Sequence, residues 1–304
     1  MTTLLIVLAV GFAWSIGAHY TGAVMGMPHA LGAIGAWQAL LLMAPLAFLG
    51  ATFASHEVEK RVGSGLTYGA LSVSQQVVVI GVAFAVTTFF NRFRMPTSTI
   101  QILVFSVIGV ALATGTGVRW DSIGHLIIVW AAAPLAAIFL GLLLTLGLDR
   151  LRLGERIGTA LVAMGAIAAF AMGANDVSNA SGALVGTGTF SPLEAGAIGG
   201  AAIAVGVLTW GKPLLRRVAF DIVDVDRAMA TAAQLVQAAV VLAAVAFGFF
   251  TSMNQALVGA MAGAGFARGR ETVHLSTLLL ILQGWLLGPA ASIAAAYVFG
   301  LAVR

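Results

Sequence analysis

One apolar stretch of the chain is interrupted by a cluster of polar side chains at residues 173–182, which read Gly-Ala-Asn-Asp-Val-Ser-Asn-Ala-Ser-Gly. A carboxylate at the centre of a bilayer costs about 2.5–3.5 kcal/mol on insertion scales, so Asp176 needs a compensating partner there. The glycines predict a break in the helix, and a broken helix offers free N–H groups to anions and free carbonyl groups to cations. We therefore expect substrate contacts from Asn175, Ser178, Asn179 and Ser181.

Asp176 is also the candidate site for a coupling cation, either by holding Na⁺ together with Asn175 and backbone carbonyls or by taking up a proton. Two plainer interpretations stay open. Asn, Ser and Gly are common where membrane helices pack against each other, and Asp176 could simply accept hydrogen bonds from a helix end.

Hydroxyl groups stand where two short apolar segments begin, at Thr97 and Ser98 and again at Thr251 and Ser252. At a helix N-terminus a hydroxyl can cap the helix or donate to a bound anion, and one role does not exclude the other. We predict Ser98, Thr99 and Ser252 as substrate-binding residues, with pure capping as the alternative.

The composition indicates whether these polar groups lie in a soluble protein or in a membrane protein. Of the 304 residues, 60% are hydrophobic and 9% are charged, and the mean hydropathy is +1.03, whereas soluble domains carry about 25% charged residues. The chain is therefore predicted to be an all-α polytopic membrane protein.

The absence of Cys excludes disulfides, thiol catalysis and cysteine-based metal sites. The net charge of +4 comes from 15 Lys and Arg scattered between apolar spans, which does not suggest a nucleic-acid-binding face.

Motifs of soluble and membrane enzymes are missing or incomplete. Residues 206–212 read Gly-x-x-x-x-Gly-Lys, but Pro213 replaces the hydroxyl residue that would hold Mg²⁺, and the stretch ends an apolar span. No metalloprotease or serine hydrolase pattern occurs. We predict that the protein is not an enzyme and needs no cofactor besides a coupling ion, H⁺ or Na⁺.

The chain divides into about ten apolar segments at its charged and Gly/Pro-rich stretches. No small-residue cleavage site follows the first run, so it is predicted to stay as a span and not to be a signal peptide. The shortest segments could be half-helices or hairpins because about 20 residues are needed to cross a bilayer. The segments are residues 4–25, 33–54, 75–90, 97–113, 123–148, 157–180, 192–210, 229–250, 254–266 and 275–302.

Unusual motifs recur along the chain at offsets that agree within two residues. Thr97-Ser98-Thr99-Ile100-Gln101 is echoed by Thr251-Ser252-Met253-Asn254-Gln255, 154 residues later. Trp130 with Pro134 recurs as Trp285 with Pro289, and Gly17-Ala18 recurs as Gly173-Ala174. We infer two halves, residues 1–149 and 157–304, joined by a charged linker at residues 150–156.

Five segments in each half is an odd number, so the second half must enter the membrane the other way up. The fold class predicted is therefore two inverted-topology repeats of about five membrane segments each, with broken or re-entrant helices at the midplane. Secondary transporters have this architecture, with the substrate site between the repeats.

The distribution of positive charge predicts the orientation. Loops after odd-numbered segments hold eleven Lys and Arg residues, whereas loops after even-numbered segments and the C-terminus hold four. Cytoplasmic loops retain positive charge, so both termini are expected outside the cell membrane.

At residues 173–180 the sequence resembles the inorganic phosphate transporter (PiT) family, whose repeats each carry a signature close to Gly-Ala-Asn-Asp-Val-Ala-Asn-Ala. Seven of the eight positions match, with Ser178 in place of Ala. The stretch 96–99 and its echo at 251–252 also look like the family's Pro-x-Ser-Thr-Thr helix start. The resemblance covers essentially the whole chain, without the long central soluble loop of many members, and it implies an ion-coupled oxyanion carrier that forms a homodimer.

The first half departs from this signature. It reads Gly17-Ala18-His19-Tyr20-Thr21-Gly22, so one of the two family carboxylates is missing. Hydrogen phosphate has a P–O–H donor that a buried carboxylate can accept, whereas sulfate has only acceptors and needs donors. His19 could supply a donor or titrate near neutrality, although a lone His is more often structural. The residues of this half predicted to bind substrate are Gly17, Ala18, His19, Thr21 and Gly22.

The stretch 16–26 is also similar to the sulfate permease branch of the family. The function predicted is symport of a tetrahedral oxyanion, sulfate before phosphate, coupled to H⁺ or Na⁺. A passive anion channel and a membrane scaffold without transport are the alternatives. The sequence leaves open the stoichiometry, the oligomeric state, and rocking against elevator-like motion.

Overall fold

The computed structural model describes residues 1–93, 95, 97–151, 154–215 and 225–304. All the regular elements in this part of the chain are helices, and eight spans are long and apolar enough to cross a bilayer. In chain order the helices are α1 (Thr2–Ala30), α2 (Ala36–Phe53), α3 (His56–Ser64), α4 (Val73–Phe93), α5 (Thr99–Thr114), α6 (Trp120–Leu151), α7 (Arg156–Asp176), α8 (Ser178–Gly186), α9 (Pro192–Trp210), α10 (Arg227–Ala246), α11 (Met253–Phe266) and α12 (Leu275–Gly300).

The predicted ten apolar segments are all present as helices, so the all-α membrane fold is confirmed. The segment predicted at 192–210 has the same bounds as α9, and the segment 157–180 corresponds to α7 with the start of α8. Helix α3 was not predicted, because its sequence His-Glu-Val-Glu-Lys-Arg-Val-Gly-Ser is too polar to count as an apolar segment.

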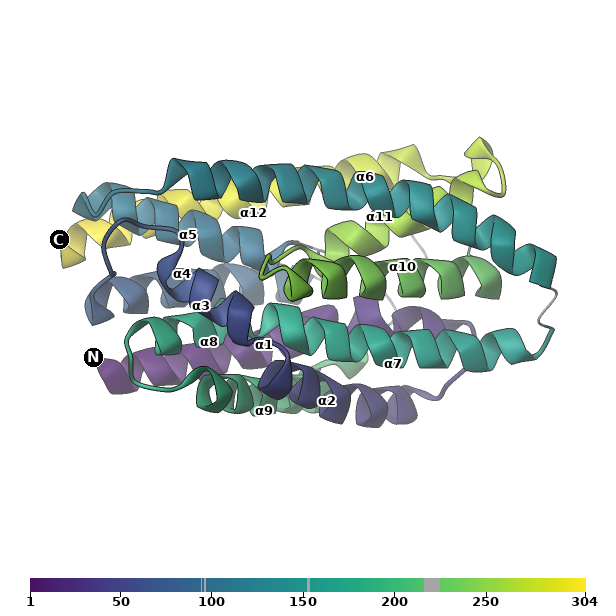
Figure 1. Cartoon of the computed structure of the whole chain (residues 1–304), viewed down its shortest axis with the longest axis horizontal. Helices are drawn as coiled ribbons and strands as arrows, with labels where there is room; N and C mark the ends of the chain where they lie inside the picture. Colours follow the sequence, from purple (N-terminus) through teal and green to yellow (C-terminus); the bar gives the residue numbers. More distant parts are fainter. Residues whose placement is uncertain (94, 96, 152–153, 216–224) are drawn as a thin grey trace.

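The two halves run in opposite directions, which confirms the inverted repeats. Helix α1 runs from the end of the molecule that holds both termini, whereas its counterpart α7 runs back toward that end (Figure 1). The first helices of each half (α1 and α2, α7 and α9) form one layer, and the later helices (α4 to α6, α10 to α12) form the other (Figure 1). The halves interleave, since α1 packs on α9, α2 on α7, α5 on α12 and α6 on α11.

Glycines fix these contacts between the halves. A Cβ on Gly17 would overlap the carbonyl oxygen of Ile203, and a Cβ on Gly173 would overlap that of Ala47. These two contacts are related by the repeat, because each member is 156 residues from its counterpart. Small residues allow membrane helices to approach this closely, so the paired glycines of the predicted repeat join helices of the two halves within the first layer, around one pseudo-twofold axis.

Two helical hairpins enter the molecule from opposite ends and turn in its middle. The hairpin α4–α5 comes from the end with the termini and the hairpin α10–α11 from the other end (Figure 1). Helices α5 and α11 have 16 and 14 residues, which at 1.5 Å per residue gives about 21–24 Å, less than the ~30 Å hydrocarbon core. The end of α4 is at mid-depth because Asn91 donates to the carbonyl of Ser15, midway along α1, at 3.0 Å. The expected re-entrant helices are therefore these hairpins.

The interruption expected within residues 173–182 is only one residue long. Val177 separates α7 from α8 and keeps helical dihedral angles, φ −59° and ψ −35°. The next turn tightens locally, because the N–H of Ala180 bonds to the carbonyl of Val177 at 3.0 Å. This stretch is buried and keeps helical dihedral angles at Val177, so the free helix ends that were expected here are instead supplied by α5 and α11.

The hairpins also change the count of positive charges. Arg92 lies in the last turn of α4, one residue from Asn91, and thus at the hairpin tip and on neither face. Arg94, Arg152, Arg216 and Arg217 lie outside the described residues.

Many large apolar side chains are exposed along the helices, including Phe139 at 62% and Leu286 at 73%. This is the surface expected of helices that face lipid tails.

Candidate functional site

The N-termini of α5 and α11 meet in the middle of the molecule. Ser98 and Ser252 are the N-cap residues, and their hydroxyl oxygens accept from the N–H groups of Gln101 and Gln255 at 3.4 and 3.3 Å. The preceding N–H groups of each first turn have no partner within their own helix, and each helix start carries about half a positive charge. Two such ends brought together from opposite sides form an environment for an anion.

Asn175 of α7 holds the tip of the second hairpin. Its side-chain amide donates to the carbonyl of Thr251 at 2.8 Å, and its oxygen accepts from the N–H of Thr251 at 3.1 Å. His19 occupies the equivalent place in the first half and lies 3.2 Å from the carbonyl of Thr97, at the tip of the first hairpin. His19 and Asn175 therefore lie beside the backbone carbonyl at equivalent places of the two hairpin tips.

His19 also joins the two hairpins to each other. Its Nδ1 lies against Oδ1 of Asn91 on α4, and its Nε2 lies 3.1 Å from Nδ2 of Asn254 on α11. The Asn91 amide already donates to Ser15, so Nδ1 of His19 is the donor in that pair. In a neutral His19, Nε2 then accepts from the Asn254 amide, and the carbonyl of Thr97 accepts from that same amide at 2.6 Å and not from the ring. In this conformation His19 acts as a bridge within the protein.

Asp176 lies in a second polar cluster, one residue along from Asn175. It is fully buried, and its Oδ1 lies 3.5 Å from the hydroxyl of Thr99 and 3.4 Å from the side-chain amide of Asn179. Tyr20, the counterpart of Asp176 in the first half, places its hydroxyl 2.9 Å from that of Thr99. The amide of Asn179 also donates to Thr99 at 2.9 Å. Thr99 is thus the centre at which both halves and the first hairpin meet.

Several oxygen atoms of these clusters have no hydrogen-bond partner among the described residues. Oδ2 of Asp176 and Oδ1 of Asn179 are buried acceptors of this kind. An unpaired buried acceptor costs about 1–3 kcal/mol, so a group that satisfies these oxygens would stabilise the site. Oxygen atoms from a carboxylate, an amide and a hydroxyl are ligands suited to a hard cation or to a proton held between them. The other unpartnered polar atoms at the hairpin starts are the hydroxyl oxygens of Thr97 and Thr251 and the amide oxygens of Gln101, Asn254 and Gln255.

The remaining predicted residues have other partners. The hydroxyl of Thr21 donates to the carbonyl of Gly17, and that of Ser178 donates to the carbonyl of Asn175. Ser181 faces away from the centre and donates to Glu59 of α3. Gly17 packs against α9, and Ala18 and Gly22 are buried in α1. The structure therefore brings His19, Thr99, Asn175, Asp176 and Asn179 together at the hairpin tips, with Ser98 and Ser252 as caps.

Comparisons with known proteins show the family of this chain. The sequence profile of the phosphate transporter family matches residues 16–159 and again residues 152–296. The chain belongs to the phosphate transporter family. A double match to one profile is consistent with the two repeats, and the chain is a transporter and not an enzyme.

Relatives of this transporter carry different substrate names. It is 27% identical over 305 residues to the sulfate permease CysP of Bacillus subtilis, over 96% of this chain and 85% of the permease. It is 35% identical over 130 residues to inorganic phosphate transporter 2-1, chloroplastic, of Arabidopsis thaliana, over 38% of this chain and 22% of the relative. The solved structure of "The sodium-dependent phosphate transporter" has the same fold, with a TM-score of 0.90 at 21% identity, over 100% of this chain and 99% of that chain.

Sequence reasoning missed three members of the transporter's central clusters. Asn91 and Asn254 were not predicted, because their contacts with His19 join residues 72 and 235 positions apart. Tyr20 could have been found from the repeat itself, since the offset of 156 that pairs Gly17 with Gly173 also pairs Tyr20 with Asp176.

Proposed function

We propose that this transporter symports a tetrahedral inorganic dianion, sulfate, with H⁺ or Na⁺ bound at Asp176. The observation that carries the proposal is the meeting of two opposed helix N-termini beside one buried carboxylate. The Lys and Arg side chains that the structure describes are all at least partly exposed, so side-chain cations do not neutralise a bound anion. Helix ends and a co-transported cation are the groups left for this task.

Charge balance favours cation symport over a passive anion channel. Two helix starts, at about half a charge each, offset about one of the two charges on a dianion. The remaining charge and the Asp176 carboxylate require cations or protons if the loaded site is to be close to neutral in a medium of low dielectric constant. Asp176, Asn175 and Asn179 with Thr99 are the proposed cation ligands.

Sulfate is proposed before phosphate because the first half presents Tyr20 where the second presents Asp176. A hydroxyl can donate to an anion that has only acceptors, whereas a carboxylate repels it unless protonated. The 27% identity to a sulfate permease over most of the chain supports the same choice. Phosphate remains the alternative substrate.

The proposed setting is the cell membrane, with both termini outside. Figure 1 shows the connections between α6 and α7 and between α11 and α12 at the end away from the termini, and Arg227 and Arg268 lie at that end because they pair with Glu155 and Asp149. That face carries more positive charge than the face with the termini, which supports the orientation. A homodimer is proposed from the family resemblance alone.

The test is uptake of labelled sulfate into proteoliposomes that contain the purified protein. We expect concentrative uptake that stops when the Na⁺ and proton gradients are collapsed, and that unlabelled phosphate inhibits only at a large excess. Equal inhibition by phosphate would reverse the order of substrates. Uptake that follows the sulfate gradient without a cation would support the channel instead.

A further inference from the structure

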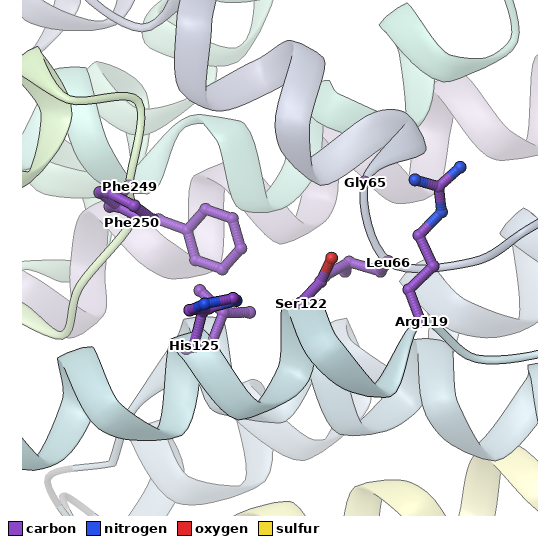
Figure 2. A pocket seen from close by; sticks show the side chains of 8 residues that line it. Gly65, Leu66, Arg119, Ser122, His125, Phe249 and Phe250 are labelled. Carbon is purple, nitrogen blue, oxygen red and sulfur yellow. The ribbon is translucent and has the colours of Figure 1, made fainter.

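A cavity of about 350 Å³ lies between the start of α6 and the tip of the second hairpin. Its wall includes Ser122 and His125 on α6, with Arg119 just before that helix, and Phe249 and Phe250 from the hairpin. Figure 2 shows the Ser122 hydroxyl and the His125 ring on the same side as the Phe250 ring, with the Arg119 guanidinium at one edge. Cavities of this size are typical of small-ligand sites.

The polar part of this wall suits an anion. Arg119, Ser122 and His125 each carry hydrogen-bond donors, and the eight lining residues include no carboxylate. Arg119 is held in place, because its Nε donates to the carbonyl of Thr67 at 2.9 Å and its guanidinium lies 5.4 Å from the centre of the Tyr68 ring. A guanidinium fixed in this way keeps its two terminal amino groups as donors for an oxyanion.

The cavity is adjacent to the proposed transport site. Phe250 is fully buried and precedes Thr251, whose backbone N–H and carbonyl are held by Asn175. The aromatic side chain therefore separates the cavity from the residues at the start of α11. A movement of the hairpin tip that displaced Phe250 would join the two compartments.

The repeat keeps only part of this chemistry in the second half. At the offset of 155 that relates Trp130 to Trp285, the counterpart of His125 is Leu280, whose exposed fraction is 61%. The counterparts of Arg119 and Ser122 are His274 and Thr277. The second half thus keeps a basic and a hydroxyl residue at the start of its last helix, and His125 is the polar member of the cavity wall that is specific to the first half.

We propose that Arg119, Ser122 and His125 form an oxyanion-binding vestibule on the face that holds both termini. It captures sulfate or phosphate before the anion passes Phe250 to the central site. This inference rests on the proposed transport function, but binding in the vestibule can be measured separately from transport.

The test uses a Ser122→Cys variant, which carries a single thiol because the chain has no Cys. The rate of modification by a membrane-impermeant thiol reagent is measured in proteoliposomes, with and without sodium sulfate, against sodium gluconate at equal ionic strength. We expect sulfate to slow the modification, and Arg119→Gln to remove this protection. His125→Cys is the second labelling position if Ser122→Cys does not fold.

Arg304→Gln is the matched control, because Arg304 is a cation at the same end of the molecule that does not line the cavity. Protection should survive this change. Arg119→Gln should also raise the KM for sulfate about two- to fivefold, the range of a partly exposed ion pair, while kcat stays the same. The Arg304→Gln variant should leave both constants unaltered.

Absence of sulfate protection, or protection that Arg119→Gln leaves intact, would overturn the vestibule. If the wild-type protein takes up no sulfate while protection persists, the transport proposal fails and the binding site stands. If uptake is coupled to a cation but sulfate gives no protection, the transport proposal stands and the vestibule proposal fails.

Discussion

Asp176 is the residue on which the proposed coupling depends. Its carboxylate is buried with Thr99 and Asn179 as its hydrogen-bond partners, and one oxygen is unpartnered among the described residues. Asp176→Asn keeps the size of the side chain but removes the charge. A hydrogen bond to a charged group contributes about 1.5–3 kcal/mol, so cation binding should weaken roughly ten- to a hundredfold.

The measurement is the dependence of initial sulfate uptake on Na⁺ and on pH, in Asp176→Asn and wild-type proteoliposomes. Asp226→Asn, a change at the N-cap of α10 outside the central clusters, is the control. Uptake by Asp176→Asn that remains concentrative and cation-dependent would show that coupling occurs elsewhere.

Glu59 is the second buried carboxylate of the described chain, in the short helix α3. Burial raises its pKa from 4.5 to about 7, although its hydrogen bond from Ser181 acts in the opposite direction. Between these values the folded protein keeps a proton that the unfolded chain has lost. Stability should therefore fall as pH rises from about 4.5 to about 7, by on the order of 3 kcal/mol.

Thermal unfolding in detergent between pH 5 and 8 checks this prediction. Glu59→Gln should unfold at a temperature that changes less over this range, since it carries no titrating group there. Glu155→Gln is the control, because the Glu155 side chain is fully exposed. Equal pH dependence in wild type and Glu59→Gln would contradict the assignment.

At the scale of helices, the approach of α7 to α2 sets the next prediction. Gly173→Ala would place a methyl group against the carbonyl of Ala47, and overpacking of this kind costs about 1–3 kcal/mol or more. Gly147→Ala in α6 is the matched control, because nothing lies within 4 Å of its Cβ position. Alanine there should be neutral or stabilising by up to about 1 kcal/mol.

Melting temperatures of the two variants, measured in the same detergent, distinguish these outcomes. A lower value for Gly173→Ala and an unchanged or higher value for Gly147→Ala are expected. If both variants melt like wild type, the close contact between α7 and α2 does not exist in the membrane.

The helices could be predicted from the sequence because apolar runs are bounded by charged residues, as at Arg227, the first residue of α10. The repeat also predicted their opposed directions. The sequence could not distinguish a crossing helix from α4, which has 21 residues and is long enough to span but turns at mid-depth. That turn depends on contacts between Asn91 and α1, and such distant pairs leave no periodic pattern in the chain.

The site, like the fold, could be predicted only in part from the sequence. Asn175, Asp176 and Asn179 were identifiable because polar groups interrupt an apolar run, and the structure places them at the hairpin tips. Ser181 shares that polar run but faces α3, because only one side of a helix can face the centre. The sequence marked the polar run, and only the packing decided which of its members point inward.

At the scale of the whole molecule, the orientation follows from two opposite faces with unequal positive charge. Single-cysteine variants test it because the chain has no Cys. Thr189→Cys, between α8 and α9, lies on the face of the termini, and Glu155→Cys lies on the opposite face. In intact cells an impermeant reagent should label Thr189→Cys directly and Glu155→Cys only after permeabilisation. The reverse pattern would place the termini inside.

The interleaving of the halves has a consequence for how the chain is made. Helices α1 and α2 find their tightest partners in α9 and α7, which leave the ribosome only after the whole first half has been synthesised. A fragment ending near residue 149 would leave Gly17 and its neighbours facing lipid, until a second copy inserted upside down beside it. Such a fragment would bury these surfaces only in an antiparallel pair with a second copy. A duplicated gene that joins two copies in one reading frame gives each half its own orientation, so no single half has to insert both ways up.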